Sequence, residues 1–318
     1  MDRDKVFIKN AKPTGIGGQA VIEGVMMKGP KDLAIAVRKP DGDIIVKKEA
    51  LKGLSQSSLA KTPIIRGVIA LLDAMVLGVR CLTYSAEFWE EEDESLKKGK
   101  FESWVEHKLG DKANDVMIYF SVFIAIALSI LIFIISPTLV TSFLKTKISS
   151  HIWLNVVEGL MRIILFIGYV LLISKMKDIQ RVFQYHGAEH KTIHCYENGL
   201  PLTVDNARQF TTLHPRCGTS FLLIVMVISM ILFSLIGWPN PFVRIVSRLV
   251  LMPVVAGISY EIIRWAGKSK SKLVCMISYP GLMLQKLTTK EPDDSQLEVA
   301  IDAMQAVLTD DKEADHWE

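Results

Sequence analysis

Residues 185–195, with the sequence YHGAEHKTIHC, contain three histidines, a glutamate and a cysteine. On a helix, His186, His190 and His194 follow one another at intervals of four residues, about 40° apart in projection, so their imidazoles line one face. Imidazole nitrogens on one face can converge on a metal ion. His186, Glu189 and His190 also form the pattern H-x-x-E-H, in which two histidines bind zinc and the glutamate activates water. The segment therefore predicts histidine ligands and Glu189 as a general base.

A second short segment, LHPRCG at residues 213–218, supplies two further ligand types, His214 and Cys217. A mixed shell of imidazole, thiolate and carboxylate favours zinc, with iron or manganese as alternatives. The predicted metal ligands are His186, His190, His194, His214 and Cys217. Cys195 lies about 100° round the helix from His194 and is the weakest candidate. The alternative interpretation is a structural network of buried or interfacial polar side chains.

Four apolar runs flank these candidates, at residues 116–135, 152–173, 220–237 and 242–263. A helix needs about 20 apolar residues to cross roughly 30 Å of hydrocarbon. Residues 152–173 carry only Glu158 and Arg162 as formal charges, and their spacing of four lets them pair on one face. The short segment GWPNPF at 237–242 predicts a tight link between the last two runs. The expected fold class is a mainly α membrane protein with about four transmembrane helices.

The distribution of basic residues predicts the orientation of these helices. Lysines and arginines concentrate in residues 174–219 and just after residue 263, and such flanks favour the cytoplasmic side. Both termini are therefore predicted to be cytoplasmic, in the cytoplasmic (inner) membrane. The N-terminal segment MDRDKVFIKN lacks the apolar core of a signal peptide. The net charge is +3, and the basic residues are spread along the membrane boundaries rather than gathered in one patch. This distribution argues against a nucleic-acid partner.

The region before the first apolar run is predicted to contain a β-hairpin, an amphipathic helix and a glycine-rich segment. Residues 32–50 predict a β-hairpin with its turn at 39–42. Residues 62–81 predict an amphipathic interfacial helix with Thr62 as its cap and Pro63 at its first position, a fifth membrane crossing being the alternative. The glycines of residues 15–30 predict a tight turn or a close approach between segments rather than a dinucleotide site, and Glu23 among them is expected to cap or pair.

Four regions follow from these patterns. Residues 1–60 form a cytoplasmic N-terminal segment with the hairpin, and 61–115 an amphipathic helix with a charged linker around 87–100. Residues 116–265 form the transmembrane bundle with a His/Cys-rich cytoplasmic loop at 174–219, and 266–318 a cytoplasmic tail with an amphipathic helix. No helix breaker separates the run 152–173 from residues 180–198, so one continuous helix is expected to carry the histidines. The four cysteines, at 81, 195, 217 and 275, show no disulfide framework.

Several long motifs resemble one family. The stretches GIGGQAVIEGVMMKGP, YHGAEHKTIHCYENG, LHPRCGTSF and PGLMLQKLTTKEPDD, followed by QLEVAIDA, are similar to the motifs of the YqhQ-like family. This is a group of bacterial membrane proteins of unknown function, described as predicted metal-dependent enzymes. The resemblance covers nearly the whole chain and implies no particular substrate.

The expected function is metal-assisted hydrolysis of a membrane-associated peptide or lipid at the cytoplasmic face of the bilayer. The main alternative is a non-catalytic membrane scaffold or assembly factor, in which the histidines bind a structural metal or hold the subunits of a homo-oligomer together. Metal transport is disfavoured because ionisable pairs within the apolar runs are few.

Overall fold

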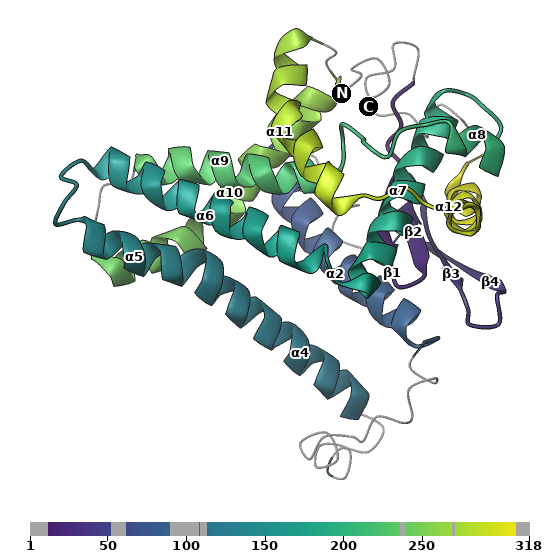
Figure 1. Ribbon diagram of the computed structural model, residues 1–318, viewed down its shortest axis with the longest axis horizontal. Coiled ribbons are helices and arrows are strands. Elements are labelled where there is room, and N and C mark those ends of the chain that lie inside the picture. The colour runs from purple at the N-terminus through teal and green to yellow at the C-terminus, as the bar shows by residue number, and fades with distance from the viewer. Residues whose placement is uncertain are drawn as a thin grey trace. The chain divides into compact units, whose positions relative to one another are not determined.

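The computed structural model describes residues 12–51, 62–89, 108, 113–235, 240–268 and 271–309. The chain is mainly helical, with a small N-terminal β-sheet (Figure 1). It divides into two compact units. The sheet unit comprises Met1–Trp89, Ile167–Ile228 and Pro253–Glu318, and the helical unit comprises Glu90–Phe166 and Ser229–Met252.

The sheet is an antiparallel meander in which neighbours in sequence are neighbours in space. Its strands are β1 (Gly17–Val21), β2 (Gly24–Lys28), β3 (Asp32–Arg38) and β4 (Ile44–Ala50). The hairpin expected at 32–50 is confirmed, with Arg38 paired to Ile44 and Gly42 at a φ of 92° in the turn. Strands β1 and β2 were not expected from the sequence. Their glycines allow close approach, since a Cβ at Gly18 would lie 2.6 Å from the carbonyl oxygen of Met26.

Two helices pack on this sheet and form its core. They are α7 (Lys177–Glu197) and α12 (Asp294–Val307), which lie beside the strands in Figure 1. Their buried apolar side chains meet those of β2 and β3 in one cluster that includes Tyr185, Ala188, Leu297, Met304, Met27 and Ala36. The capping box between Asp293 and Gln296 starts α12. The C-terminal region thus contributes a core helix, after α11 (Lys272–Thr288).

The predicted amphipathic helix exists as α2 (Ile65–Ala86), but its predicted start is wrong. Thr62 does not cap it, and Ile64 precedes the helix with a φ of 68° and no side-chain cap. A tertiary contact explains this start, because the Ile64 N–H donates to Glu261 Oε1 at 3.2 Å. Arg66 forms an ion pair with the same carboxylate. The other end of α2 is tied to β4 by the Arg80–Glu49 ion pair.

Among the described residues, three helices are long and apolar enough to cross a membrane, namely Val116–Leu144, His151–Ile173 and Phe242–Trp265. The first joins α4 (Ala113–Ile130), a π-helical turn η5 (Leu131–Ile135) and α5 (Ser136–Leu144). It therefore continues past residue 135, where the sequence predicted its end. The π-turn accommodates Pro137, which has no N–H for a regular helical bond.

The other two are α6 (His151–Ile173) and part of α10 (Pro241–Lys268). The apolar helix α9 (Gly218–Ser234) has 17 residues and is shorter than the other three. Residues 237–239 of the predicted link at 237–242 fall outside the described residues, and residues 241 and 242 already belong to α10. The charged linker at 87–100 also lies outside the described residues, beyond Trp89.

The continuous helix expected through residues 152–198 is interrupted. Helix α6 ends at Ile173, and α7 begins at Lys177 after Met176, whose ψ of 133° is extended. The break changes the direction of the chain so that α7 packs on the sheet, where Tyr185 is buried and donates to Glu23 Oε2 at 3.1 Å. Glu23 also pairs with Arg181, so it is a structural partner as expected. A short helix, α8 (Val204–Arg208), follows α7.

Candidate metal centre

Three predicted ligands converge where α7 meets the start of α9. His186 and His190 lie one turn apart on α7, and Cys217 directly precedes α9. One ligand atom from each of the three lies within 4.8 Å of the other two. His186 Nε2 is 3.2 Å from Cys217 Sγ. Nitrogen and sulfur ligands of one tetrahedral zinc ion lie about 3.5 Å apart, so this spacing fits a zinc site.

Backbone carbonyls fix the tautomers of both histidines. His186 Nδ1 is 2.9 Å from the carbonyl oxygen of Thr288, and His190 Nδ1 is 2.5 Å from that of Thr212. A carbonyl oxygen can only accept, so each Nδ1 carries the proton and donates. Each Nε2 is then left with a free lone pair, as in metal-bound histidines whose other nitrogen is held by a carbonyl.

The local pKa values favour the protonation states that bind metals. Burial lowers the pKa of His190 to about 4, although Cys217 opposes this shift. Burial raises the pKa of Cys217, but His190 and hydrogen bonds from Thr219 outweigh it, so the net pKa lies below that of a free thiol. A neutral imidazole beside an ionisable thiol is the combination that a divalent metal requires.

Glu189 lies beside the three ligands but is held separately. Its Oε1 accepts a hydrogen bond from the Gly18 N–H at 3.0 Å, and its Oε2 lies 4.0 Å from His186 Nε2. A Cβ at Gly18 would lie 2.9 Å from Glu189 Cγ, so only glycine lets β1 approach this closely. Burial raises the pKa of the Glu189 carboxyl to about 7, with His186 opposing. Such a group can both accept and release a proton near neutral pH.

A cavity of about 450 Å³ adjoins these residues. One wall is the glycine-rich segment at 15–20, and another is the α7 face that carries His186, Glu189 and His190. Cys217 and Ala74 of α2 complete part of the lining. The candidate ligands and the candidate base thus face a common space that a small molecule or a chain segment can occupy.

The two remaining predicted ligands belong to a second, adjoining group. Ligand atoms of His194, His214 and Glu197 lie within 4.8 Å of one another. The rings of His190 and His214, one from each group, have centroids 5.4 Å apart. The five ligands predicted from the sequence, together with Glu197, therefore form two groups of three. Glu197 was missed, although its position three residues after His194 places it on the same helix face.

The second group already contains a cation. Arg216 pairs with Glu197, and the Thr14 N–H donates to Glu197 Oε1 at 2.8 Å. Burial, together with Arg216 and His194, lowers the pKa of His214 well below its ordinary value. His194 Nε2 is 3.0 Å from the Leu213 carbonyl oxygen and donates to it. These contacts form a buried polar network around Arg216, in which His194 Nδ1 is left without a hydrogen-bond partner among the described residues.

These groups are held in position by residues that lie outside the predicted ligand motifs. Gln285 of α11 accepts from the His214 N–H and donates to the His214 carbonyl oxygen, both at 2.8 Å. A Cβ at Gly187 would collide with the carbonyl oxygen of Lys290, so only glycine fits at this position of α7, next to His186. Cys195 is a core residue, and burial raises the pKa of its thiol to about 11.

Comparison with known proteins gives a family but no activity. Residues 62–310 match the family described as "Protein of unknown function (DUF1385)". The chain is 36% identical over 309 residues to "Uncharacterized protein YqhQ" of Bacillus subtilis (strain 168), covering 94% of each chain. No solved structure matches. The extent of these two matches shows that the chain belongs to the DUF1385 family, whose function is unknown.

Proposed function

We propose that this protein is a metal-dependent hydrolase of the bacterial cytoplasmic membrane, acting on a membrane-associated peptide or lipid. The observation that carries the proposal is the convergence of three ligand atoms, from His186, His190 and Cys217, beside a cavity that Glu189 also lines. A structural zinc site is usually closed by four protein ligands, whereas a catalytic site keeps one position open. Three protein ligands next to a cavity favour the catalytic case.

The membrane placement rests on the apolar helices. We infer four spans, formed by the three long helices and the shorter α9, with both termini on the cytoplasmic side. Large apolar side chains on their surfaces support contact with lipid, for example Phe123, Phe143 and Leu172. Three of the four spans exceed the roughly 20 residues that the hydrocarbon requires.

Helix α2 is proposed to lie along the cytoplasmic interface. Arg66 near its start pairs with Glu261, close to the C-terminal end of α10, and Arg80 near its end pairs with Glu49 of the sheet. Both partners belong to the side that the basic flanks assign to the cytoplasm. Its exposed Leu72, Met75 and Val76 supply an apolar surface for the bilayer.

Metal binding and proton transfer would be carried out by different residues. His186, His190 and Cys217 would hold a divalent metal, zinc first, with iron or manganese as alternatives. When bound, such an ion supplies a Lewis acid that polarises a carbonyl or phosphoryl oxygen and makes water more acidic. Glu189 would accept the proton of the attacking water at Oε2, because Oε1 is engaged by the Gly18 N–H. The Gly18 contact would hold the carboxylate in position during this transfer.

A non-catalytic scaffold is the second candidate. It is favoured by the polar network of His194, Glu197, His214 and Arg216, whose side chains are all buried or nearly so. In this case the histidine-rich region serves folding or assembly, including assembly of a homo-oligomer.

The two candidates differ most at Glu189. In the hydrolase, Glu189→Gln keeps the size of the side chain and its hydrogen bond from Gly18 but removes the base. We expect the variant to fold and retain its metal yet fail to complement a deletion strain. Normal complementation would exclude the hydrolase. Metal content and thermal stability are measured on the same purified protein, so that loss of the base is separated from loss of the fold.

A further inference from the structure

Strand β1 lies at an edge of the sheet, and its backbone has one side that points away from β2. The strand order is β1-β2-β3-β4, so β1 pairs with β2 alone among the described strands. Backbone groups of successive residues in an antiparallel strand point alternately towards the partner and away from it. The Gly18 N–H donates to Glu189, and the Ile22 N–H donates to Ser85 Oγ at 3.2 Å, so the even-numbered residues point away from β2. Ala20, between them, presents its N–H and C=O in the same direction.

The backbone of Gly18 and Ala20 forms what we call the free edge of β1. Proteins commonly protect such an edge with a charged side chain, a proline or a bulge. The strand has the sequence GGQAV, with no charge and no proline. It pairs with β2 residue by residue from Gly17 to Val21, without a bulge. An edge of this kind can accept a further extended chain through main-chain hydrogen bonds.

The free edge belongs to the wall of the candidate cavity. Residues 15–20 line this cavity of about 450 Å³ together with Ala74 of α2 and with Val182 and Phe183 of α7. Both helices contact β1 and lie beside it in Figure 1. The volume lies in the range of ligand-binding pockets. A Cβ at Gly17 would meet no described atom within 4 Å, so packing within the described residues does not require glycine there, and the backbone stays open to a ligand.

The free edge also leads to the candidate base. Glu189 Oε1 accepts from the Gly18 N–H, and Gly18 lies about 7 Å along the strand from Ala20. A chain bonded to Ala20 and continuing along the edge would therefore pass Glu189 and His186, which line the same cavity. An extended polypeptide repeats its N–H and C=O groups at this spacing. A glycerophospholipid has ester carbonyls but no such row of N–H donors, so the edge favours a peptide.

We propose that the substrate of this site is a polypeptide segment in extended conformation, which adds to the free edge of β1 through the N–H and C=O of Ala20. This mode of binding rests on the proposed hydrolase for the cleavage that follows, and it selects the peptide from the two substrate classes. Main-chain hydrogen bonds supply affinity without selecting a sequence. Selectivity would come from side chains of the bound segment that enter the cavity, beside Val182 and Phe183.

The test uses the full chain purified in an uncharged detergent and an array of short peptides that tile β-casein. Binding is measured with the wild type and with Glu189→Gln, in which cleavage should fail. The tightest-binding peptide is then made in two N-methylated forms, one methylated at the odd positions and one at the even positions. An added strand bonds through every second residue, so we expect one form to bind about tenfold more weakly and the other to bind nearly as the parent.

Each outcome of the peptide measurements has a definite meaning. Equal effects of the two methylated forms, or no binding by any peptide of the array, would overturn strand addition. Competitive binding or hydrolysis of phosphatidylglycerol without any peptide binding would assign the site to a lipid instead. Alternating sensitivity to methylation without cleavage by the wild type would support strand addition and contradict the hydrolase, so the two proposals fail separately.

A proline variant tests the edge from the protein side. Ala20→Pro removes the outward N–H but no hydrogen bond between β1 and β2, and proline is tolerated at such edge positions. It is expected to weaken the tightest peptide about tenfold. Val46→Pro is the matched control on β4, at the other edge of the sheet. The Leu51 N–H donates to the Lys31 carbonyl oxygen, so the even-numbered residues of β4 point away from β3, and the exposed Val46 does so.

The control should bind the peptide within about twofold of the wild type, because β4 does not line the cavity. Gly17→Val is a second variant, which keeps every backbone group but places a side chain beside the free edge, and it should also weaken binding. Unchanged binding by folded Ala20→Pro would overturn the proposal. If Ala20→Pro does not fold, Gly17→Val and the methylated peptides decide. Thermal unfolding and zinc content are measured on each variant, so loss of the fold or of the metal is seen separately.

Discussion

His186 Nε2 and Cys217 Sγ lie 3.2 Å apart although 31 positions separate the two residues in the chain. Neither histidine spacing on α7 nor the segment LHPRCG determines this contact alone. It depends on the loop after α7 returning Cys217 to the helix face that carries His186 and His190.

Replacing any member of the first ligand group should remove the metal. His186→Ala, His190→Ala and Cys217→Ser are each expected to lose most of the bound zinc, because two remaining ligands hold the ion far less tightly than three. The metal content of purified protein, measured by mass spectrometry after mild chelation, checks this. His151→Ala is the matched control, since His151 is exposed at the start of α6. Full zinc in both histidine variants would show that the group binds no metal.

The second group should contribute to stability without contributing to metal binding. Glu197→Gln removes the negative charge that pairs with Arg216 and is expected to lower the free energy of unfolding by about 1–3 kcal/mol. The folded fraction should retain its zinc. Asp205→Asn is the control. The Asp205–Arg208 pair is exposed, so its loss should lower the free energy of unfolding by less than about 1 kcal/mol. Loss of zinc from folded Glu197→Gln protein would instead make Glu197 a ligand.

Two adjacent glycines should respond differently to alanine. At Gly18 a Cβ would meet the Met26 carbonyl oxygen at 2.6 Å and Glu189 Cγ at 2.9 Å, whereas at Gly17 no atom lies within 4 Å. Gly18→Ala is therefore expected to cost about 1–3 kcal/mol and to displace Glu189. Gly17→Ala should stay within about 0.5 kcal/mol of the wild type. Denaturant unfolding of the two variants measures the difference, and equal stabilities would contradict the close approach of β1 to α7.

Cys195 should resist alkylation in the folded protein. Burial raises the pKa of its thiol to about 11, so the reactive thiolate is scarce at pH 8. The folded state holds the thiol neutral, and the associated stability is present below the ordinary thiol pKa and is lost as the pH rises towards 11. Peptide mapping after iodoacetamide treatment should find Cys195 modified only after unfolding. Rapid modification at pH 8 in native protein would contradict its burial.

Reporter fusions test the proposed topology. Fusions after Lys177 and at the C-terminus are expected to report a cytoplasmic location, and a fusion near Lys147, between α5 and α6, an external one. The basic flanks of the apolar runs motivate this expectation. A cytoplasmic signal from the fusion near Lys147 would exclude the four-span arrangement.

Local sequence determined the features that depend on short-range periodicity. The length of an apolar run sets whether a helix can cross a bilayer, and intervals of four residues place His186, His190 and His194 on one helix face. The hairpin of β3 and β4 follows from two β-branched runs around a turn containing Gly42. In each case the relevant residues are neighbours within one element, so their types and spacing suffice.

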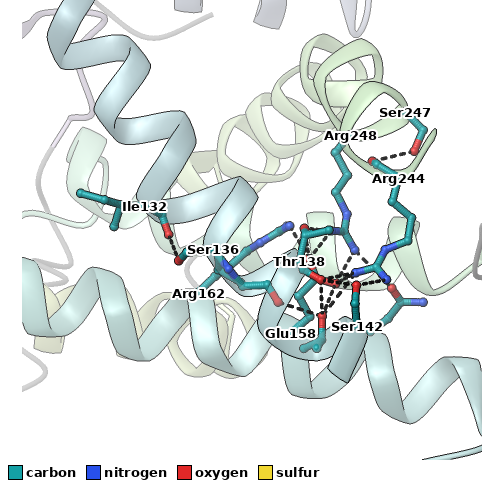
Figure 2. Close-up of polar contacts among 12 residues, drawn as sticks. Ile132, Ser136, Thr138, Ser142, Glu158, Arg162, Arg244, Ser247 and Arg248 are labelled. Atoms are coloured by element: carbon teal, nitrogen blue, oxygen red, sulfur yellow. Dashed lines mark hydrogen bonds and ion pairs between the residues drawn. The ribbon is translucent and has the colours of Figure 1, made fainter. Parts of the chain in front are cut away.

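The ion pairs of Glu158 depend on both local spacing and tertiary packing. Glu158 and Arg162 are four residues apart on α6, and the pair predicted from this spacing is confirmed at 2.7 Å. Arg244 and Arg248 of α10 pair with the same carboxylate, as Figure 2 shows. The first pair needs only one helix, whereas the other two require α10 to pack against α6.

Only the tertiary structure decided which atoms meet between elements. The carbonyl oxygens of Thr212 and Thr288 fix the histidine tautomers, and the Gly18 N–H holds Glu189 across 171 positions. The division of the ligands into two groups likewise depends on how separate segments pack. A backbone carbonyl is present at every residue and leaves no mark in the sequence. The positions of these two carbonyls are set by how α11 and the loop between α8 and α9 pack against α7, which no local pattern encodes.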